Sequence, residues 1–208
     1  MYDSIFISYR REGSSTFAGI LYDVFCKRFP STGVFKDKNK LRPGKDFKKQ
    51  IEEAIDKSFV VLVLINKGWL ELTDDTGKKK LSDEDDFIRH EIRTGITKEK
   101  YILPVLFEGG KMPAKKDLPD DIKKLSDYQA FQVDPDNVSK SINSLSDELL
   151  LLSTDNLQGS VVRSLDKLKK NPKGTLKDLS TNYLNFAKRE ANAIMGYFNK
   201  LKKKKKDK

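Results

Sequence analysis

Glu91 is the carboxylate in this sequence whose neighbours are best suited to chemistry. It lies four residues after Phe87 in a stretch with helical spacing of apolar residues, and residues four apart share one face of a helix. The spacing therefore predicts a carboxylate beside an aromatic ring that can exclude water. The alternative is a glutamate on the solvated side of a helix, where most glutamates lie.

Arg10 and Arg11 form a second candidate group. They directly follow the apolar run Ser4–Tyr9, which has the composition of a strand. An arginine carries its donors in a planar fork that matches the oxygens of a phosphate. The two residues thus predict a phosphate contact at the end of a strand, with simple solvation of the strand end as the alternative.

The counts of cysteine and histidine exclude several other chemistries. The sequence has one cysteine, Cys26, and one histidine, His90. A disulfide within the chain needs two cysteines. A zinc site or a Ser-His-Asp triad would have only one histidine and one cysteine available. We expect no metal. We also expect Cys26 to pack in the first helix and His90 to lie on the surface, about 100° around its helix from Glu91.

Short apolar runs alternate with helical patterns over the first three quarters of the chain. The run Ser58–Ile65 (SFVVLVLI) is continuously apolar after its first residue, as in a strand covered on both faces. Pro104 interrupts a similar run and predicts an edge-like or bulged position. The sequence predicts strands at 4–9, 33–35, 58–65, 101–107 and 128–133, and helices at 17–29, 47–55, 83–96 and 138–152.

This alternation predicts an α/β fold with a five-stranded parallel, flavodoxin-like sheet and helices on both faces. For the strand order 2-1-3-4-5, the connections that leave the first and third strands diverge, and a crevice forms at their carboxyl ends. Arg10, Arg11 and Trp69 follow these two strands. Topology alone therefore places them at the predicted ligand site.

Four motifs follow one another in a fixed order along the chain. They are IFISYRR at Ile5–Arg11, VFKDKNKLRPG at Val34–Gly44, DFIRHEI at Asp86–Ile92 and YILPVL at Tyr101–Leu106. Together they resemble the successive signatures of Toll/interleukin-1 receptor (TIR) domains, and are similar to those of bacterial and animal members that cleave NAD. The likeness covers about residues 3–150.

The resemblance implies that Glu91 is the catalytic carboxylate of an enzyme that acts on NAD+. Active members usually carry tryptophan at the position of Phe87, so here the apolar wall remains but the indole donor is lost. Asp37, Leu41, Gly44 and Phe47 could instead belong to a polar connecting loop, which is often an assembly surface in this family. Trp69 could instead pack in the protein interior. The residues implied to bind substrate are Arg10, Arg11, Asp37, Leu41, Gly44, Phe47, Trp69 and Phe87.

The chemistry of the nicotinamide–ribose bond explains why one carboxylate is enough. The bond breaks through an oxocarbenium-like cation, as in glycoside hydrolysis. Nicotinamide departs as a neutral molecule, so no general acid is needed, and one negative charge near the cation gives the main assistance. Attack by water gives ADP-ribose, and attack by an atom of the substrate itself gives a cyclic ADP-ribose. NAD+ is the substrate, and no cofactor is expected.

Charge differs between the predicted TIR domain, residues 1–152, and the helical C-terminal extension, residues 153–208. Residues 1–150 hold 26 Lys/Arg and 26 Asp/Glu, whereas residues 151–208 hold 15 and 5, so the net charge of +10 lies in the tail. The tail has helical apolar spacing from Leu176 to Leu201 and then the run Lys202–Lys206. We expect it to pack on the domain, another copy or a partner protein, or to bind an anionic membrane surface. Specific nucleic-acid binding is not expected, because no aromatic residues interleave with the lysines.

Two other functions remain open from the sequence. One is a non-catalytic adaptor that binds other TIR domains, favoured by Phe87 and opposed by Glu91. The other is a sensor that binds an NAD-derived ligand without turnover. For the enzyme, the resemblance implies self-association through TIR–TIR contacts and a role in bacterial antiviral defence signalling. The chain start lacks a signal-peptide pattern, and no apolar run approaches the length of a membrane span, so we expect a cytoplasmic protein.

Overall fold

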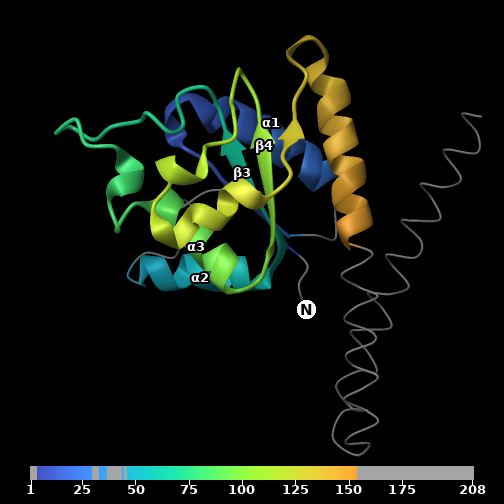
Figure 1. Cartoon of the computed structure of the whole chain (residues 1–208). Helices are drawn as coiled ribbons and strands as arrows, with labels where there is room; N and C mark the ends of the chain where they lie inside the picture. The colour runs from blue at the N-terminus through green and yellow to red at the C-terminus, as the bar shows by residue number, and fades with distance from the viewer. Residues whose placement is uncertain (1–3, 30–32, 37–43, 45, 154–208) are drawn as a thin grey trace, which may run out of the picture. The chain divides into compact units, whose positions relative to one another are not determined.

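The computed structural model describes residues 4–29, 33–36, 44 and 46–153 (Figure 1). All of them belong to the first of two units, Met1–Asn156. The predicted helical extension, apart from Ser153, lies outside the described residues. Asp37 and Leu41 of the predicted substrate site also lie outside them.

Five parallel strands form one sheet in the order β2-β1-β3-β4-β5, as predicted. The last strand is much shorter than the predicted one and pairs only with Val105 and Leu106 of β4. At Pro104, β4 therefore has a described neighbouring strand on one side only, as at the edge of a sheet. The pairing of β4 with β3 continues through Pro104 without a bulge. The strands are β1 (Ser4–Ser8), β2 (Gly33–Phe35), β3 (Ser58–Ile65), β4 (Tyr101–Leu106) and β5 (Phe131–Gln132).

Helices cover both faces of the sheet (Figure 1). One face packs against α1 and the helix of residues 138–153, and the other against α2, α3 and the 3-10 segment η4. No helix within the described ranges combines the length and the apolar composition needed to span a membrane. The bounds are α1 (Arg11–Arg28), α2 (Phe47–Lys57), α3 (Phe87–Thr97) and η4 (Asp120–Asp127).

Strand β3 is buried along its whole length because its side chains alternate between two cores. Val60, Leu62 and Leu64 pack in the core that includes α1. Their neighbours Val61 and Val63 pack in the core that includes α2 and α3. This two-sided burial is the physical reason for the continuous apolar run in the sequence.

The helix that carries Glu91 begins at Phe87, four residues later than the predicted start at Asp83. Asp86 caps this helix, and its carboxylate accepts a hydrogen bond of 2.9 Å from the backbone N–H of Arg89. A capping side chain satisfies a donor that has no partner within the helix. The acidic residues before the cap therefore belong to the connection from β3 and not to the first turn of the helix.

Helix α1 begins at Arg11 instead of Phe17, directly after β1, and its first turn is interrupted at Glu12 and Gly13. Gly13 has a φ of 76°, a left-handed conformation that glycine adopts without strain. The Asn66 amide donates a hydrogen bond of 3.3 Å to the Gly13 carbonyl, which joins the turn after β1 to the end of β3. Farther along the helix, Cys26 is exposed: it does lie in the first helix, but the expectation that it packs there is wrong.

Candidate active site

A cavity of about 520 Å³ lies at the carboxyl ends of β1 and β2, beside the start of α3. Topology predicts a crevice at the carboxyl ends of β1 and β3. The cavity lies instead at β1 and β2, and the connection that follows β3 contributes to its wall. Its walls come from the end of β1, the start of α1, the end of β2, the connection between β3 and α3, and α3 itself. The polar groups on these walls include Arg10, Arg11, Lys36, Asp86 and Glu91.

Glu91 presents a buried carboxylate to this cavity. The residue is 5% exposed, and the hydroxyl of Ser8 donates a hydrogen bond of 2.7 Å to its Oε2. Ser8 is the last residue of β1 and has no exposed surface. Phe87, one turn earlier in α3, lines the same cavity. Helix α3 therefore places the carboxylate and the ring on one cavity wall, which is the arrangement that their spacing predicts.

Arg10 lines the cavity but is held by a carboxylate of the protein. Its two terminal nitrogens contact the two carboxylate oxygens of Asp86 at 2.5 and 3.0 Å, and the residue is 6% exposed. Asp86 thus occupies the fork that the sequence assigns to a substrate phosphate. The Nε of Arg10 is buried and has no hydrogen-bond partner among the described residues, so a substrate oxygen that reached it would satisfy it.

The other predicted substrate residues lie in different surroundings. Arg11 and Phe87 line the cavity, and Phe87 is 38% exposed. Phe47 packs edge-on against Phe87, with ring centroids 4.5 Å apart. Gly44 has a φ of 76° and is not among the described residues of the cavity wall. Trp69 packs, which is the alternative that the sequence left open: its side chain is 2% exposed in the core that includes α2 and α3, and it is not among the described residues of the cavity wall.

Among the described residues of the cavity wall, acidic groups outnumber basic groups. Two of them are paired with lysines: the Lys80 ammonium donates to Glu12 at 2.7 Å, and the Lys48 ammonium donates to Asp85 at 2.5 Å. Each contact lowers the pKa of the carboxyl that it touches, so both carboxylates stay ionised well below neutral pH. The excess of negative charge favours a ligand with a positive group. The acidic residues are Glu12, Asp74, Asp83, Asp85, Asp86 and Glu91, and the basic ones are Arg10, Arg11, Lys36 and Lys80.

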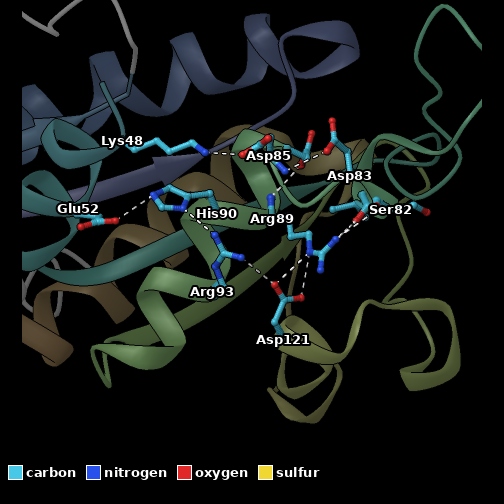
Figure 2. Close-up of polar contacts among 11 residues, drawn as sticks. Lys48, Glu52, Ser82, Asp83, Asp85, Arg89, His90, Arg93 and Asp121 are labelled. Atoms are coloured by element: carbon cyan, nitrogen blue, oxygen red, sulfur yellow. Dashed lines mark hydrogen bonds and ion pairs between the residues drawn. The ribbon is translucent and has the colours of Figure 1, made fainter. Parts of the chain in front are cut away.

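A network of polar contacts holds α3 between α2 and η4 (Figure 2). Arg89 and Arg93 of α3 contact the carboxylate of Asp121 in η4 at 3.0 and 3.2 Å. Arg93 also lies 3.1 Å from the Nδ1 of His90, and the Nε2 of His90 lies 3.4 Å from a carboxylate oxygen of Glu52 in α2. These contacts fix the position of the helix that carries Glu91.

His90 is buried, contrary to the expected surface position. It is 5% exposed, and burial together with the nearby Arg93 guanidinium lowers the pKa of its imidazole. In the neutral ring, Nδ1 accepts from Arg93, which places the ring proton on Nε2, facing Glu52. Nε2 lies 3.4 Å from the Glu52 carboxylate, too far or too poorly aligned for a hydrogen bond, and has no other hydrogen-bond partner among the described residues. His90 does point away from Glu91, but α2 covers that side of the helix.

Two residues of the site, Ser8 and Asp86, were not predicted to have a role there. Asp86 carries a local signal, since an aspartate directly before the first apolar residue of a helix is a typical cap. Ser8 carries none, because its partner Glu91 lies 83 residues away. Alternation along an extended strand does place Ser8 on the same side as Arg10. The sequence offers no more specific indication that Ser8 contacts Glu91.

A doubly wound parallel sheet with a ligand-sized cavity at the carboxyl ends of its strands defines a flavodoxin-like α/β protein. The profile of one such family, described as "TIR domain", matches residues 5–145. The chain therefore belongs to the TIR domain family.

The TIR domains of one solved structure are similar in fold, and two further structures align with lower scores. The TIR domains of the activated Roq1 resistosome, which recognises the pathogen effector XopQ, align with a TM-score of 0.53 at 15% identity, over 70% of this chain and 98% of that one. A TIR-STING receptor from C. gigas in complex with 2′,3′-cGAMP aligns with a TM-score of 0.45 at 19% identity, over 70% and 40% of the two chains. A prokaryotic SEFIR domain also gives 0.45 at 19% identity, over 69% and 95%. None of the curated proteins matches the chain significantly.

Proposed function

We propose that this TIR domain cleaves the nicotinamide–ribose bond of NAD+ and releases nicotinamide with ADP-ribose or a cyclic ADP-ribose. The observation that carries the proposal is the buried carboxylate of Glu91 on the wall of the cavity at the carboxyl ends of β1 and β2. Glutamate is rarely buried without a partner or a task. The TIR family includes NAD+-cleaving enzymes, and the resemblance matches their catalytic glutamate to Glu91.

The proposed reaction needs a fixed negative charge. As the C–N bond breaks, nicotinamide leaves with the bonding electron pair and positive charge develops on the ribose. A carboxylate in a site that excludes water stabilises this charge more strongly than it would in bulk water. Glu91 takes this role, and Phe87 forms the apolar wall beside it. The attacking nucleophile, water or an atom of the substrate, then releases its proton to solvent.

The cavity wall suits both ends of the substrate. Its acidic excess favours the positively charged nicotinamide ring, and its cations offer partners for the pyrophosphate. Arg11 and Lys36 are the proposed pyrophosphate ligands, with the unsatisfied Nε of Arg10 as a further donor. The pair between Arg10 and Asp86 fixes the start of α3. Gly44 and Phe47 keep their proposed places near the substrate through the resemblance alone.

Substitution of Glu91 by glutamine tests this function. Gln keeps the size of the side chain and an oxygen that accepts from Ser8, but it removes the charge. We expect Glu91→Gln to lower kcat for nicotinamide release by about 100-fold or more, as loss of a transition-state contact typically does. The measurement is nicotinamide and ribosyl products resolved by mass spectrometry after the full chain, at high concentration, is incubated with NAD+.

The matched control is Glu84→Gln, which removes a carboxylate from an exposed residue outside the cavity. It should leave kcat unchanged. Nicotinamide release that survives Glu91→Gln would rule out the proposed mechanism.

A second candidate is a TIR–TIR adaptor without catalysis. It is favoured by Phe87, which is partly exposed where active relatives usually carry tryptophan. The Roq1 TIR domains belong to an activated assembly. By analogy we propose that this chain self-associates, whether it acts as an enzyme or as an adaptor. We propose that it does so in bacterial defence signalling. Sedimentation that shows assembly, together with no release of nicotinamide from NAD+, would favour the adaptor.

A further inference from the structure

The contact between Ser8 and Glu91 joins two residues that are both buried. Ser8 has no exposed surface and Glu91 has 5%, and the Ser8 hydroxyl lies 2.7 Å from Oε2. A hydrogen bond to a charged acceptor is stronger than one between neutral groups, and burial increases the effect. The hydrogen bond from Ser8 therefore restricts the orientation of the Glu91 carboxylate.

Helix α3 is held to the end of β1 at two points. Arg10 pairs with Asp86 at the helix cap, and Ser8 binds Glu91 five residues later. The first contact fixes where the helix begins. The second contact acts on the Glu91 carboxylate itself.

We propose that Ser8 is a positioning residue that holds the Glu91 carboxylate in the orientation needed for cleavage. This inference rests on the proposed function of Glu91 as the group that stabilises the developing cation. Catalytic groups work best when their neighbours fix them before the reaction begins, and Ser8 supplies this preorganisation through one hydrogen bond.

Substitution of Ser8 by alanine tests the proposal. Ser8→Ala removes the donor and adds no atoms that need space. Loss of one hydrogen bond to a charged group should lower kcat for nicotinamide release by about tenfold and leave KM within about twofold. The control is Ser14→Ala, since Ser14 is also fully buried but its hydroxyl has no hydrogen-bond partner and does not line the cavity. It should leave kcat and KM unchanged.

A spectroscopic readout tests Ser8 independently of turnover. The side-chain carboxyl carbon-13 resonance of Glu91, identified by its absence in Glu91→Gln, should shift in Ser8→Ala and keep its position in Ser14→Ala. An unmoved resonance, or equal effects of the two serine variants on kcat, would overturn the role of Ser8. Full activity in Ser8→Ala combined with loss of activity in Glu91→Gln would overturn it while leaving the proposed function intact. Activity that survives Glu91→Gln would instead remove the proposed function.

Discussion

Lys100 is a lysine whose charged state is disfavoured by burial. Its side chain is 6% exposed at the start of β4, where Nζ donates to the Asp56 carbonyl at 2.6 Å and lies 4.0 Å from the Asp56 carboxylate. Burial lowers the pKa of Lys100 from 10.5 to about 8, and the Asp56 carboxylate opposes only part of this shift. The folded protein therefore releases the Lys100 proton more readily than the unfolded chain does.

This difference predicts a pH dependence of stability. Between about pH 8 and pH 10.5 the unfolded chain binds more protons at this site than the folded protein, so the free energy of unfolding should rise with pH across that window. Lys100→Met should remove this rise, as measured by urea unfolding at several pH values. The control Lys98→Met changes a more exposed lysine whose Nζ lies 3.2 Å from the same Asp56, and it should keep the rise. An unchanged pH slope in Lys100→Met would contradict the argument.

Single residues show what the sequence predicts and what it leaves undetermined. The shared face of Glu91 and Phe87 follows from helix geometry, so spacing alone was sufficient. The partners of Arg10 and Ser8 lie 76 and 83 residues away, and no local pattern specifies such a contact. For Trp69 the sequence left stacking and packing open, and the side chain packs in the core that also includes residues of α2 and α3.

Secondary-structure elements were predicted best where burial dominates the pattern. The run at β3 and the apolar stripe of α2 determine those elements, because β3 is buried on both faces and α2 buries one regularly spaced stripe. Boundaries were predicted less well. Asp86 ends the connection before α3 through a side-chain cap, and an acidic run resembles a first helical turn until the cap is known. β5 is also shorter than predicted, since only Phe131 and Gln132 of the described residues pair with β4 there.

The turn after β4 gives a prediction at this scale. Gly110 is buried against the end of β3, and a Cβ on it would lie 2.0 Å from the Ile65 carbonyl oxygen, which is backbone and cannot move aside. The same oxygen accepts a hydrogen bond from the Phe107 backbone N–H at 3.1 Å. Gly110→Ala should therefore lower the free energy of unfolding by about 2–4 kcal/mol, measured by urea unfolding.

Gly68→Ala is the control for this prediction, because a Cβ at Gly68 meets no atom within 4 Å and the residue is not in a left-handed conformation. We expect its stability to stay within about 0.5 kcal/mol of the original. If both alanine variants unfold at the same urea concentration, the close approach of Gly110 to β3 does not constrain the fold.

At the scale of the whole molecule, charge separates the TIR domain from the chain that follows it. Residues 1–150 are electrically balanced, whereas residues 151–208 carry the net charge of +10. Residues 151–208 therefore supply the long-range attraction to an anionic surface. The cavity attracts its ligand through the charges on its own wall, because more distant charges are screened by salt.

The run Lys202–Lys206 concentrates five of these charges in consecutive residues. Each lysine near an anionic membrane surface contributes about 1 kcal/mol at moderate salt, so the full chain should bind phosphatidylserine vesicles and release them as salt is raised. Substitution of all five lysines by glutamine should raise the lipid concentration for half-maximal binding by about tenfold or more. The measurement is cosedimentation of the full chain with vesicles.

The control replaces five exposed lysines scattered over the domain by glutamine and makes the same change in net charge: Lys67, Lys78, Lys111, Lys116 and Lys140. Scattered charges cannot all approach one flat surface together, so this variant should bind vesicles within about twofold of the original. An equal loss in both variants would show that total charge, and not the contiguous run, governs binding. Vesicle binding that resists high salt would mean that apolar side chains, and not the lysines, hold the chain on the membrane.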